Sequence, residues 1–377
     1  MTGRERITAA LEGRKTDKVP VMIPFYDGFI ARCGKKEQWE FDYGSESEQY
    51  QMQAAAIRRF QGNDGFWTWT GTNRGPVENV SIKYEGNVPF AIFRDGSRKL
   101  LNDDPANGMW NRTPDEVRSV YAKNCIEREG DITEKLGPVI PSKELLDKPG
   151  SRVLRKLSEK FGDRKFLWTN HSSLYASALN YLGGPEEGWI RTVTEPELVY
   201  KVLGYIKEQQ KEYIAAAAAA GAHGLWHCFM NEGTSILSPE VWRQLVKPHI
   251  REIAEAAHEC GLKDTAWFLD DCRQLVGDLI EAGIDGLATE QPRAAYRCEP
   301  GDLRKAAGDS RLCIFGWFWE EDLLSPSREE LRGSLLKQYC EAGENGSFIV
   351  SSPGLTQEFS QSTVDMIIEL AGELPVR

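Results

Sequence analysis

The sequence predicts a single (β/α)8 TIM barrel, in which eight parallel strands alternate with helices. Two observations lead to this prediction. A glycine-marked joint between a helix and a following short apolar run recurs five times in the second half of the chain. Apolar runs of strand length in the first half bring the number of strand–helix units to about eight, which favours a closed barrel over an open sheet.

Each joint places Gly after a helical pattern, and a short apolar run follows within a few residues. Gly suits this position because the residue that ends a helix usually takes left-handed backbone angles, which cost Gly nothing. The strands are short and apolar, as in a parallel sheet that is covered on both faces. The joints lie at residues 220–224, 260–264, 282–286, 307–311 and 342–346.

Helix starts and further strands support the same order. The capping-box pattern, a Ser or Thr with Glu three residues later, predicts helix starts at Thr2, Thr113, Thr194 and Ser327. Further strands are predicted over 19–25, 65–69 and 166–170. Between residues 72 and 150 the pattern loosens into a β-hairpin and a polar stretch rich in Pro and Gly. We predict one barrel domain over 1–377, with this stretch as an insertion over one end.

The composition narrows the class of protein. Hydrophobic residues make up 41% and charged residues 27% of the 377 residues, as in a globular protein. The net charge of −11 argues against nucleic acid or an anionic membrane as the main partner. No apolar run is long enough to span a membrane. The eight Cys are scattered, which fits a reduced cytoplasmic protein better than a disulfide framework.

The carboxyl ends of the strands are where a barrel of this kind carries its chemistry. Five of the eleven Trp fall at these predicted ends, which suggests a pocket for a flat or apolar ligand. The expected substrate-binding side chains are those of Tyr26, Trp67, Trp69, His171, Glu290, Trp317 and Trp319.

Several of these residues also have a structural interpretation. The pairs Trp67/Trp69 and Trp317/Trp319 alternate along predicted strands, so one member of each pair should face away from the other. At least half of this aromatic set is therefore expected to be barrel packing. His227 beside Cys228 is open to the interpretation of a packed pair without a ligand.

Two adjacent acids follow a buried strand in the segment Trp267-Phe268-Leu269-Asp270-Asp271-Cys272. A buried carboxylate without a partner is costly, so the pair needs a reason. We expect one of the two to cap the next helix. The other, Asp270 in preference, is a candidate for proton transfer, because apolar neighbours raise the pKa of a carboxyl group. The candidate catalytic set is Asp27, His227, Asp270 and Asp271.

The sequence contains residues of the types that bind zinc. Cys228 and Cys272 are the candidate metal ligands, with His227, Asp270 and Glu290 as further donors, because zinc accepts nitrogen, sulfur and oxygen ligands. The spacing of these residues does not demand a metal.

The order of the motifs resembles the uroporphyrinogen decarboxylase superfamily. Residues 1–25 are similar to its opening helix and first strand, and residues 224–261 to its central strand, Ser-Pro-Glu helix start and following helix. Residues 275–292 and 347–370 resemble its later strands and terminal helix. The resemblance is collinear over nearly the whole chain, and it implies a single (β/α)8 barrel.

The resemblance implies one of two chemistries. The first is cofactor-free decarboxylation of uroporphyrinogen, with an Asp near the first strand. The decarboxylases carry an Arg-rich run after that strand; residues 24–36 have Asp27 and Arg32 but lack the run. A substrate with eight carboxylates needs several cations, whereas the strand ends here are acidic and aromatic. An authentic uroporphyrinogen decarboxylase is therefore disfavoured.

The second chemistry is methyl transfer to or from a corrinoid protein, usually with zinc. Relatives of this kind place His-x-Cys where this sequence has residues 269–272, and a further Cys where it has Ser351-Ser352. That ligand set is missing here. The two acids, Asp270 and Asp271, stand in its place.

The hypothesis is a methyltransferase that moves a methyl group between a small methylated substrate, a methyl ether or methylamine, and a corrinoid protein. The corrinoid cofactor would be held by that partner, and bound zinc stays possible. One alternative is a metal-free decarboxylase or lyase of a small aromatic acid, with Asp27 or Asp270 handling protons. Another is a barrel that binds without catalysing.

Overall fold

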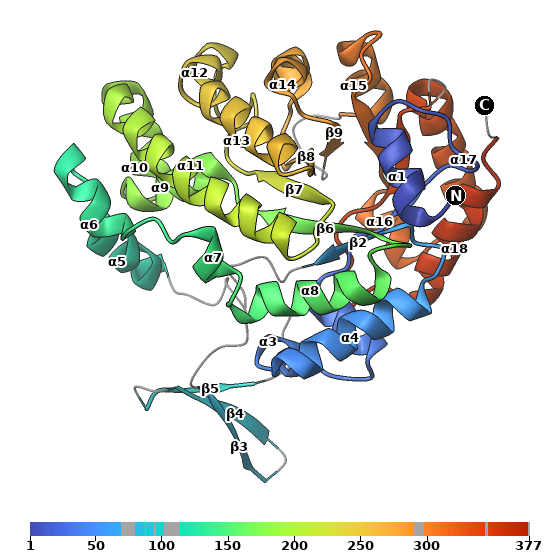
Figure 1. The fold of residues 1–377 in the computed structure, drawn as a ribbon, viewed down its shortest axis with the longest axis horizontal. Coiled ribbons are helices and arrows are strands. Elements are labelled where there is room, and N and C mark those ends of the chain that lie inside the picture. The colour runs from blue at the N-terminus through green and yellow to red at the C-terminus, as the bar shows by residue number, and fades with distance from the viewer. Residues whose placement is uncertain are drawn as a thin grey trace.

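A computed structural model describes residues 1–68, 80–86, 88–93, 96–101, 114–289, 298–343 and 346–375. At its centre is one sheet of eight strands, in the order β1–β11–β10–β9–β8–β7–β6–β2, with all ladders parallel (Figure 1). The strands are β1 (Val21–Met22), β2 (Gly65–Thr68), β6 (Phe166–His171), β7 (Gly224–Phe229), β8 (Lys263–Phe268), β9 (Gly286–Thr289), β10 (Cys313–Gly316) and β11 (Phe348–Ser351).

Helices surround this sheet, and the predicted (β/α)8 barrel is confirmed. They are α1 (Gly3–Leu11), α2 (Asp27–Cys33), α3 (Gln38–Asp42), α4 (Glu46–Arg59), α8 (Pro149–Phe161), α9 (Leu174–Tyr181), α10 (Pro185–Thr194), α11 (Pro196–Ala219), α12 (Pro239–Leu245), α13 (Lys247–Glu259), α14 (Val276–Ala282), α15 (Pro300–Ala307), α16 (Glu320–Leu324), α17 (Arg328–Gln338) and α18 (Gln361–Gly372).

The barrel closes between β1 and β2 through the side chains of two residues and one backbone hydrogen bond. The side chain of Asn63 makes the two hydrogen bonds that a neighbouring strand would make. Its Oδ1 accepts from Ile23 N (2.9 Å) and its Nδ2 donates to Ile23 O (3.1 Å). One residue on, Asp64 Oδ2 accepts from Val21 N (3.0 Å) and Asp64 N donates to Val21 O (2.8 Å). The seam is thereby satisfied although β1 has only two residues.

The glycine joints form as predicted at four of the five positions. Gly221, Gly261, Gly283 and Gly308 have positive φ angles of 94°, 76°, 95° and 56°. Gly343 differs, because it ends a π-helical turn, η3 (Tyr339–Gly343), and a Cβ there would come within 2.5 Å of the Tyr339 ring. At that joint Gly is needed because a side chain would clash with Tyr339, and not because the φ angle is positive.

Two of the predicted helix caps are confirmed. The side chains of Thr2 and Ser327 accept from the backbone three residues on. The cap predicted at Thr194 is wrong: Thr194 is the last residue of α10, and Pro196 opens α11 because its fixed φ suits the first helical turn. Thr113 lies outside the described residues.

Helix α1 closes the amino-terminal end of the barrel. Its Ile7, Ala10 and Leu11 belong to the same buried cluster as the side chains inside the barrel. The approach is close: a Cβ on Gly3 would lie 2.7 Å from the Asp64 carbonyl oxygen. The opening at the amino-terminal end of the barrel is thus filled by side chains.

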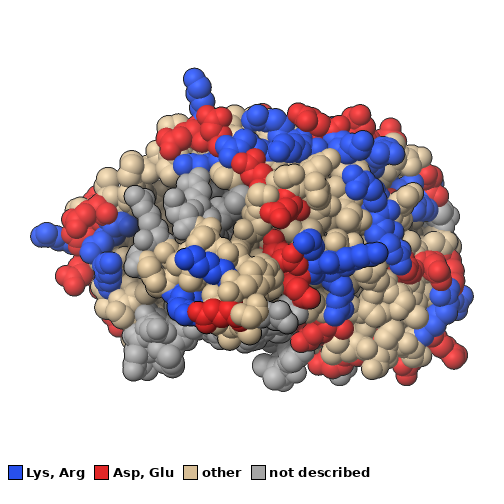
Figure 2. Space-filling model, turned by 90° about the horizontal axis from the view of Figure 1, so that it is seen from below, with Lys and Arg blue, Asp and Glu red and all other residues tan. Residues whose placement is uncertain are grey.

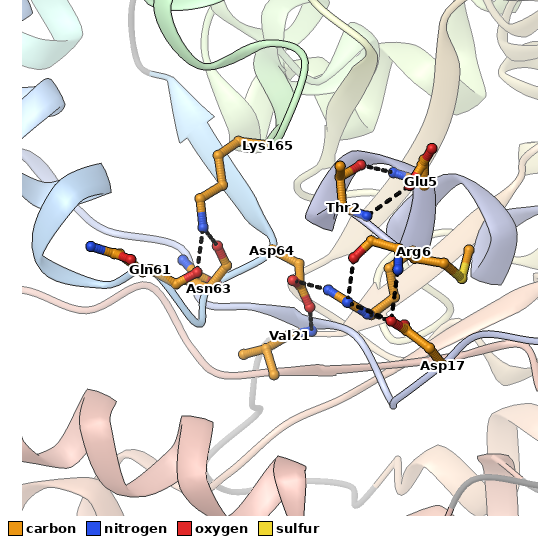
Figure 3. A network of polar contacts seen from close by, with 10 residues as sticks. Thr2, Glu5, Arg6, Asp17, Val21, Gln61, Asn63, Asp64 and Lys165 are labelled. Atoms are coloured by element: carbon orange, nitrogen blue, oxygen red, sulfur yellow. Dashed lines mark hydrogen bonds and ion pairs between the residues drawn. The ribbon is translucent and has the colours of Figure 1, made fainter.

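A polar network fixes α1 to the seam (Figure 3). Arg6 donates from Nη1 to Asp64 Oδ1 (2.5 Å) and from Nε to Asp17 Oδ1 (2.7 Å). These bonds hold the pKa of Asp17 far below its ordinary value. Lys165 Nζ donates to the carbonyl oxygens of Gln61 and Asn63, and burial lowers its pKa to about 8.

The interior of the barrel is packed with aromatic rings. Trp67, Trp168, Trp226 and Trp267 contact one another, with ring centroids 5.8 to 6.2 Å apart. Phe315 packs against Trp226 at 5.4 Å. The interior of the barrel is therefore a filled core.

The predicted insertion begins with an antiparallel sheet that projects from the barrel (Figure 1). Its strands are β3 (Ser81–Glu85), β4 (Val88–Ile92) and β5 (Arg98–Leu100), so the expected hairpin is present and has a third strand. The short helices that follow are α5 (Pro114–Asn124), η1 (Glu129–Asp131), α6 (Ile132–Leu136) and α7 (Ser142–Leu145).

The surface carries charges of both signs. Lys and Arg are interspersed with Asp and Glu over the face shown in Figure 2. Exposed ion pairs of the molecule include Lys36–Glu40 and Arg59–Asp365. Within the described part of the chain, every helix is too short or too polar to cross a membrane.

Candidate functional site

Strand alternation decides which side chains reach the open end of the barrel. On β7, Trp226 and Cys228 belong to the interior cluster, whereas Leu225 and Phe229 belong to the cluster between sheet and helices. Successive side chains of a strand point to opposite faces. Beyond the strand ends, Tyr26, Met230 and Leu269 also pack against the interior cluster.

The open end carries an aromatic group that we call the aromatic mouth: Tyr26, Trp67 and Trp267. The ring centroids of Tyr26 and Trp67 are 5.5 Å apart, and those of Trp67 and Trp267 are 5.8 Å apart. Tyr26 also lies on Gly354 after β11, where a Cβ would come within 1.9 Å of the ring. Tyr26 is half-buried and Trp267 is 9% exposed, whereas Trp67 is 1% exposed and belongs to the packed core of the barrel beneath them.

Trp317 and Trp319 contact each other, with ring centroids 4.6 Å apart. The expectation that they face apart assumed a strand over both residues. Strand β10 ends at Gly316 and Trp319 caps α16, so strand alternation no longer applies there. Trp69 and Glu290, two other predicted binding residues, lie outside the described residues.

The structure does not bring His171 and His227 to the mouth. Their rings lie 4.9 Å apart on the outer face of the sheet, and His227 Nδ1 is 3.5 Å from Asp264 Oδ2. All three are buried. Burial, with His227 close by, holds the pKa of His171 well below its ordinary value. The prediction placed these residues at strand ends without deciding which face of the sheet they occupy.

Asp270 joins the loop after β7 to the end of β8. Its Oδ2 accepts from Ser235 Oγ (2.5 Å), and its Oδ1 accepts from Asp271 N (2.7 Å). The carboxyl group packs directly on Gly233, where a Cβ would lie 2.4 Å from the Asp270 Cβ. Asp270 is 6% exposed. Through these contacts Asp270 holds the loop after β7 against the end of β8.

Asp271 is the acid that holds the following turn. Its Oδ1 accepts from the backbone N and from Nε of Arg273 (3.0 Å each), at the start of η2 (Arg273–Leu275). Burial opposes its ionisation, but the Arg273 hydrogen bonds outweigh burial and lower its pKa. Asp271 is therefore a carboxylate paired with Arg273 that holds the turn; the residue at the N-cap of η2 is Cys272, without a side-chain cap, so the expected helix cap is not formed by Asp271.

Asp27 is the predicted acid that adjoins the aromatic mouth. It follows Tyr26 directly, as the first residue of α2, and is 8% exposed. Burial favours the protonated form of a carboxyl group, whereas the start of a helix favours the carboxylate, so two opposite influences act on Asp27. The next residue, Gly28, packs on the Gln357 side chain, so the turn is tightly held.

Glu232 is an acid at this end of the barrel that the sequence interpretation missed. It is fully buried in the loop after β7, and its Oε1 lies 2.7 Å from Ser173 Oγ. Burial raises its pKa to about 8. The preceding residue, Asn231, has a φ of 62°, unusual for a residue other than Gly. The signal was present, because Glu232 follows an apolar strand just as Asp270 does.

The proposed zinc ligands are not brought together. Cys228 faces the barrel interior, whereas Cys272 lies in the outer cluster. Cys272 lies next to Cys298, and the hydrogen bond between them, with burial, raises the Cys272 pKa well above its ordinary value. Within the described ranges, no three His, Cys, Asp or Glu gather as a metal site requires. Cys228 and Cys272 therefore do not share a metal site, and Glu290 lies outside the described residues.

The described interior near the mouth is neutral. The inward-facing side chains at and beyond the strand ends carry no Lys or Arg within the described ranges. They are those of Tyr26, Trp67, Asn170, Cys228, Met230, Trp267, Leu269 and Ser351. Such a lining suits a neutral or cationic ligand with apolar groups.

Comparisons with known proteins agree with this architecture. A sequence model described as uroporphyrinogen decarboxylase (URO-D) matches residues 180–374, just over half of the 377 residues. No curated protein shows significant similarity to the chain.

Among solved structures, the chain is similar to a methyltransferase from Methanosarcina mazei. The TM-score is 0.70 at 15% identity, and the match covers 99% of each chain. At this identity the similarity supports the fold. A D-psicose 3-epimerase from Clostridium cellulolyticum H10 matches at a TM-score of 0.38 and 13% identity, over 67% of this chain and 94% of that one. That similarity carries no argument.

Proposed function

Because the chain belongs to the uroporphyrinogen decarboxylase family, we propose that it is a methyltransferase of that family. It moves a methyl group between a small methylated substrate, a methyl ether or a methylamine, and a corrinoid protein. The observation that supports this proposal most is the neutral, aromatic lining of the barrel mouth.

The lining argues against uroporphyrinogen itself as the substrate. A substrate with eight carboxylates needs several cations around it. Tyr26, which is half-buried, and Trp267, which is 9% exposed, are instead aromatic, and aromatic rings bind apolar groups and methylammonium groups well. A methyl ether or methylamine satisfies this environment.

Asp27 is the acid we propose for the proton that methyl transfer requires. When the bond from methyl carbon to oxygen or nitrogen breaks, its electron pair stays on the heteroatom, which then takes up a proton. Asp27 lies beside the aromatic mouth, whereas the Asp270 oxygens hold a loop and Asp271 is paired with Arg273. The acid role therefore moves from Asp270 to Asp27.

The corrinoid belongs to a partner protein in this proposal. When bound at the mouth, it supplies the cobalt that accepts the methyl group. The aromatic side chains at the open end fit the flat, partly apolar edge of a corrin. No step is assigned to zinc, because the described His and Cys residues do not form a site for it.

The proposal is tested by incubating the protein with cob(I)alamin and a panel of methyl ethers and methylamines, and following methylcobalamin by visible absorption. We expect transfer from at least one class. Asp27→Asn should lower kcat about 100-fold or more, the usual contribution of a positioned acid. Glu240→Gln, on the exposed start of α12, is the matched control and should leave the rate unchanged.

A metal-free decarboxylase of a small aromatic acid is the second candidate, and the family match favours it. The same samples decide between the two. Carbon dioxide release from aromatic acids without corrinoid, together with no methyl transfer from any member of the panel, would establish the decarboxylase and overturn the methyltransferase.

A further inference from the structure

The loop between β7 and α12, residues 230–238, joins the ends of three neighbouring strands. Gly233 packs on Asp270, and Ser235 donates to the same carboxyl group. Thr234 donates from its backbone N (2.7 Å) and its Oγ1 (3.1 Å) to the Asp271 carbonyl oxygen. These contacts fix the second half of the loop to β8.

Glu232 fixes the first half of the same loop to β6. The contact is made to Ser173, the residue that caps α9 just after β6. Ser173 Oγ has three polar neighbours: Ala176 N at 3.0 Å, Glu232 Oε1 at 2.7 Å and Met230 O at 3.3 Å. A hydroxyl group can make three bonds, two as acceptor and one as donor.

The hydrogen-bond count favours a neutral Glu232. If Glu232 is ionised, the single Ser173 proton must serve both the carboxylate and the Met230 carbonyl. If Glu232 carries a proton on Oε1, it donates to Ser173, and Ser173 is free to donate to Met230 O. Every bond of Ser173 is then made. The other oxygen, Oε2, is buried without a partner, which a neutral carboxyl group tolerates far better than a charged one.

The groups around the carboxyl group offer it no positive charge. Ser173 and the Trp242 indole of α12 act on it, and both favour the charged form, but burial outweighs them. On α9, Tyr175 is neutral, because burial raises its pKa to about 12. On the β8 side, Asp270 lies against Gly233. A charged Glu232 would therefore have the Ser173 hydroxyl and the Trp242 indole as donors but no cation to offset its burial, so ionisation favours an open loop that admits water.

We propose that Glu232 is a positioning residue: as a neutral acid it locks the loop 230–238 through Ser173 and the Met230 carbonyl, and loss of its proton releases the loop. Met230 follows β7 and packs against the barrel interior beside the mouth. Release of the loop therefore frees one wall of the mouth, which makes the opening of the site dependent on pH. This inference does not depend on which reaction the mouth supports.

Amide hydrogen exchange of the loop, read by mass spectrometry on peptides covering 230–238 and corrected for the intrinsic rate at each pH, tests the proposal. In the wild type, we expect protection to fall about tenfold between pH 7 and 9, since opening becomes up to tenfold more favourable per pH unit below the closed-state pKa of about 8 and levels off above it. Glu232→Gln is always neutral and should stay protected across this range.

Glu240→Gln is the matched control and should retain the wild-type pH dependence. An identical pH profile in wild type and Glu232→Gln would overturn the proposal. Infrared spectroscopy of the wild type gives a second measurement that does not need the variant to fold. A protonated carboxyl band that persists at pH 7 and disappears by pH 9 supports the neutral acid, and its absence at pH 7 refutes it.

Discussion

At the scale of single residues, Gly233 in a loop and Gly277 in a helix differ in the space around them. Gly233 faces the Asp270 carboxyl group so closely that a Cβ would lie 2.4 Å from the Asp270 Cβ. Gly277, inside α14, has nothing within 4 Å of such an atom. Only at Gly233 would a side chain clash with its surroundings.

Gly233→Ala should lower the free energy of unfolding by about 1–3 kcal/mol, the usual cost of overpacking. Gly277→Ala, its control, should raise it by about 0.5–1 kcal/mol, because Ala is the better helix former. Urea unfolding followed by circular dichroism measures both. Equal effects of the two changes would contradict the close contact between Gly233 and Asp270.

Also at the scale of single residues, the burial of Glu232 makes the folded protein less stable at neutral pH than at acidic pH. Its folded pKa of about 8 lies above the ordinary value of a carboxyl group. The stabilising effect of its proton is therefore full below the unfolded pKa and is lost as pH rises through about 8. A buried acid that lowers stability in this way is a candidate for a functional role.

At the scale of elements, the β1–β2 seam depends on one amide side chain. Asn63 supplies the partners of both Ile23 N and Ile23 O, and it is 3% exposed. Its loss leaves two buried backbone groups without partners, because β1 ends one residue earlier at Met22.

Asn63→Ala should therefore lower the free energy of unfolding by about 2–4 kcal/mol, from two unsatisfied buried groups. Gln61→Ala, two residues away, is the control, since Gln61 accepts from Lys165 through its backbone oxygen and the residue is exposed. Chemical denaturation compares the two variants. A loss below about 0.5 kcal/mol for Asn63→Ala would show that the seam is held by other contacts.

Local sequence was sufficient to predict the strands and the joints between elements. The positive φ at Gly221 and Gly283, and the apolar runs that follow, depend on neighbouring residues only. The faces of His171 and His227 were not predicted, because a shift of one residue in the assumed strand reverses every side chain. The partners of Asp270 and Glu232 were also missed, since Ser235 and Ser173 meet them only in the folded chain.

At the scale of the whole molecule, buried histidines set the response of the fold to acid. Burial lowers the pKa of both His249 and His223 to about 4, against an unfolded value of about 6.5. The unfolded chain therefore takes up protons first as pH falls. Stability that is present above about pH 6.5 is lost as pH falls towards about 4.

His249→Phe should remove part of this acid sensitivity and keep the ring contact with Tyr200, whose centroid lies 4.4 Å away. Between pH 6.5 and 5, the variant should lose about 2 kcal/mol less unfolding free energy than the wild type. His258→Gln is a control of opposite sign, because Asp285 raises the pKa of His258. Parallel pH profiles for His249→Phe and the wild type would contradict a neutral buried His249.

The packed tryptophans inside the barrel also give the molecule an optical property. Trp67, Trp168, Trp226 and Trp267 have ring centroids 5.8 to 6.2 Å from their neighbours, at fixed mutual angles. Indoles held so close couple their electronic transitions and exchange excitation energy. Their coupled ultraviolet dichroism therefore reports the integrity of the barrel separately from the helices around it. Loss of that signal while helical dichroism persists marks a barrel that has come apart inside an intact ring of helices.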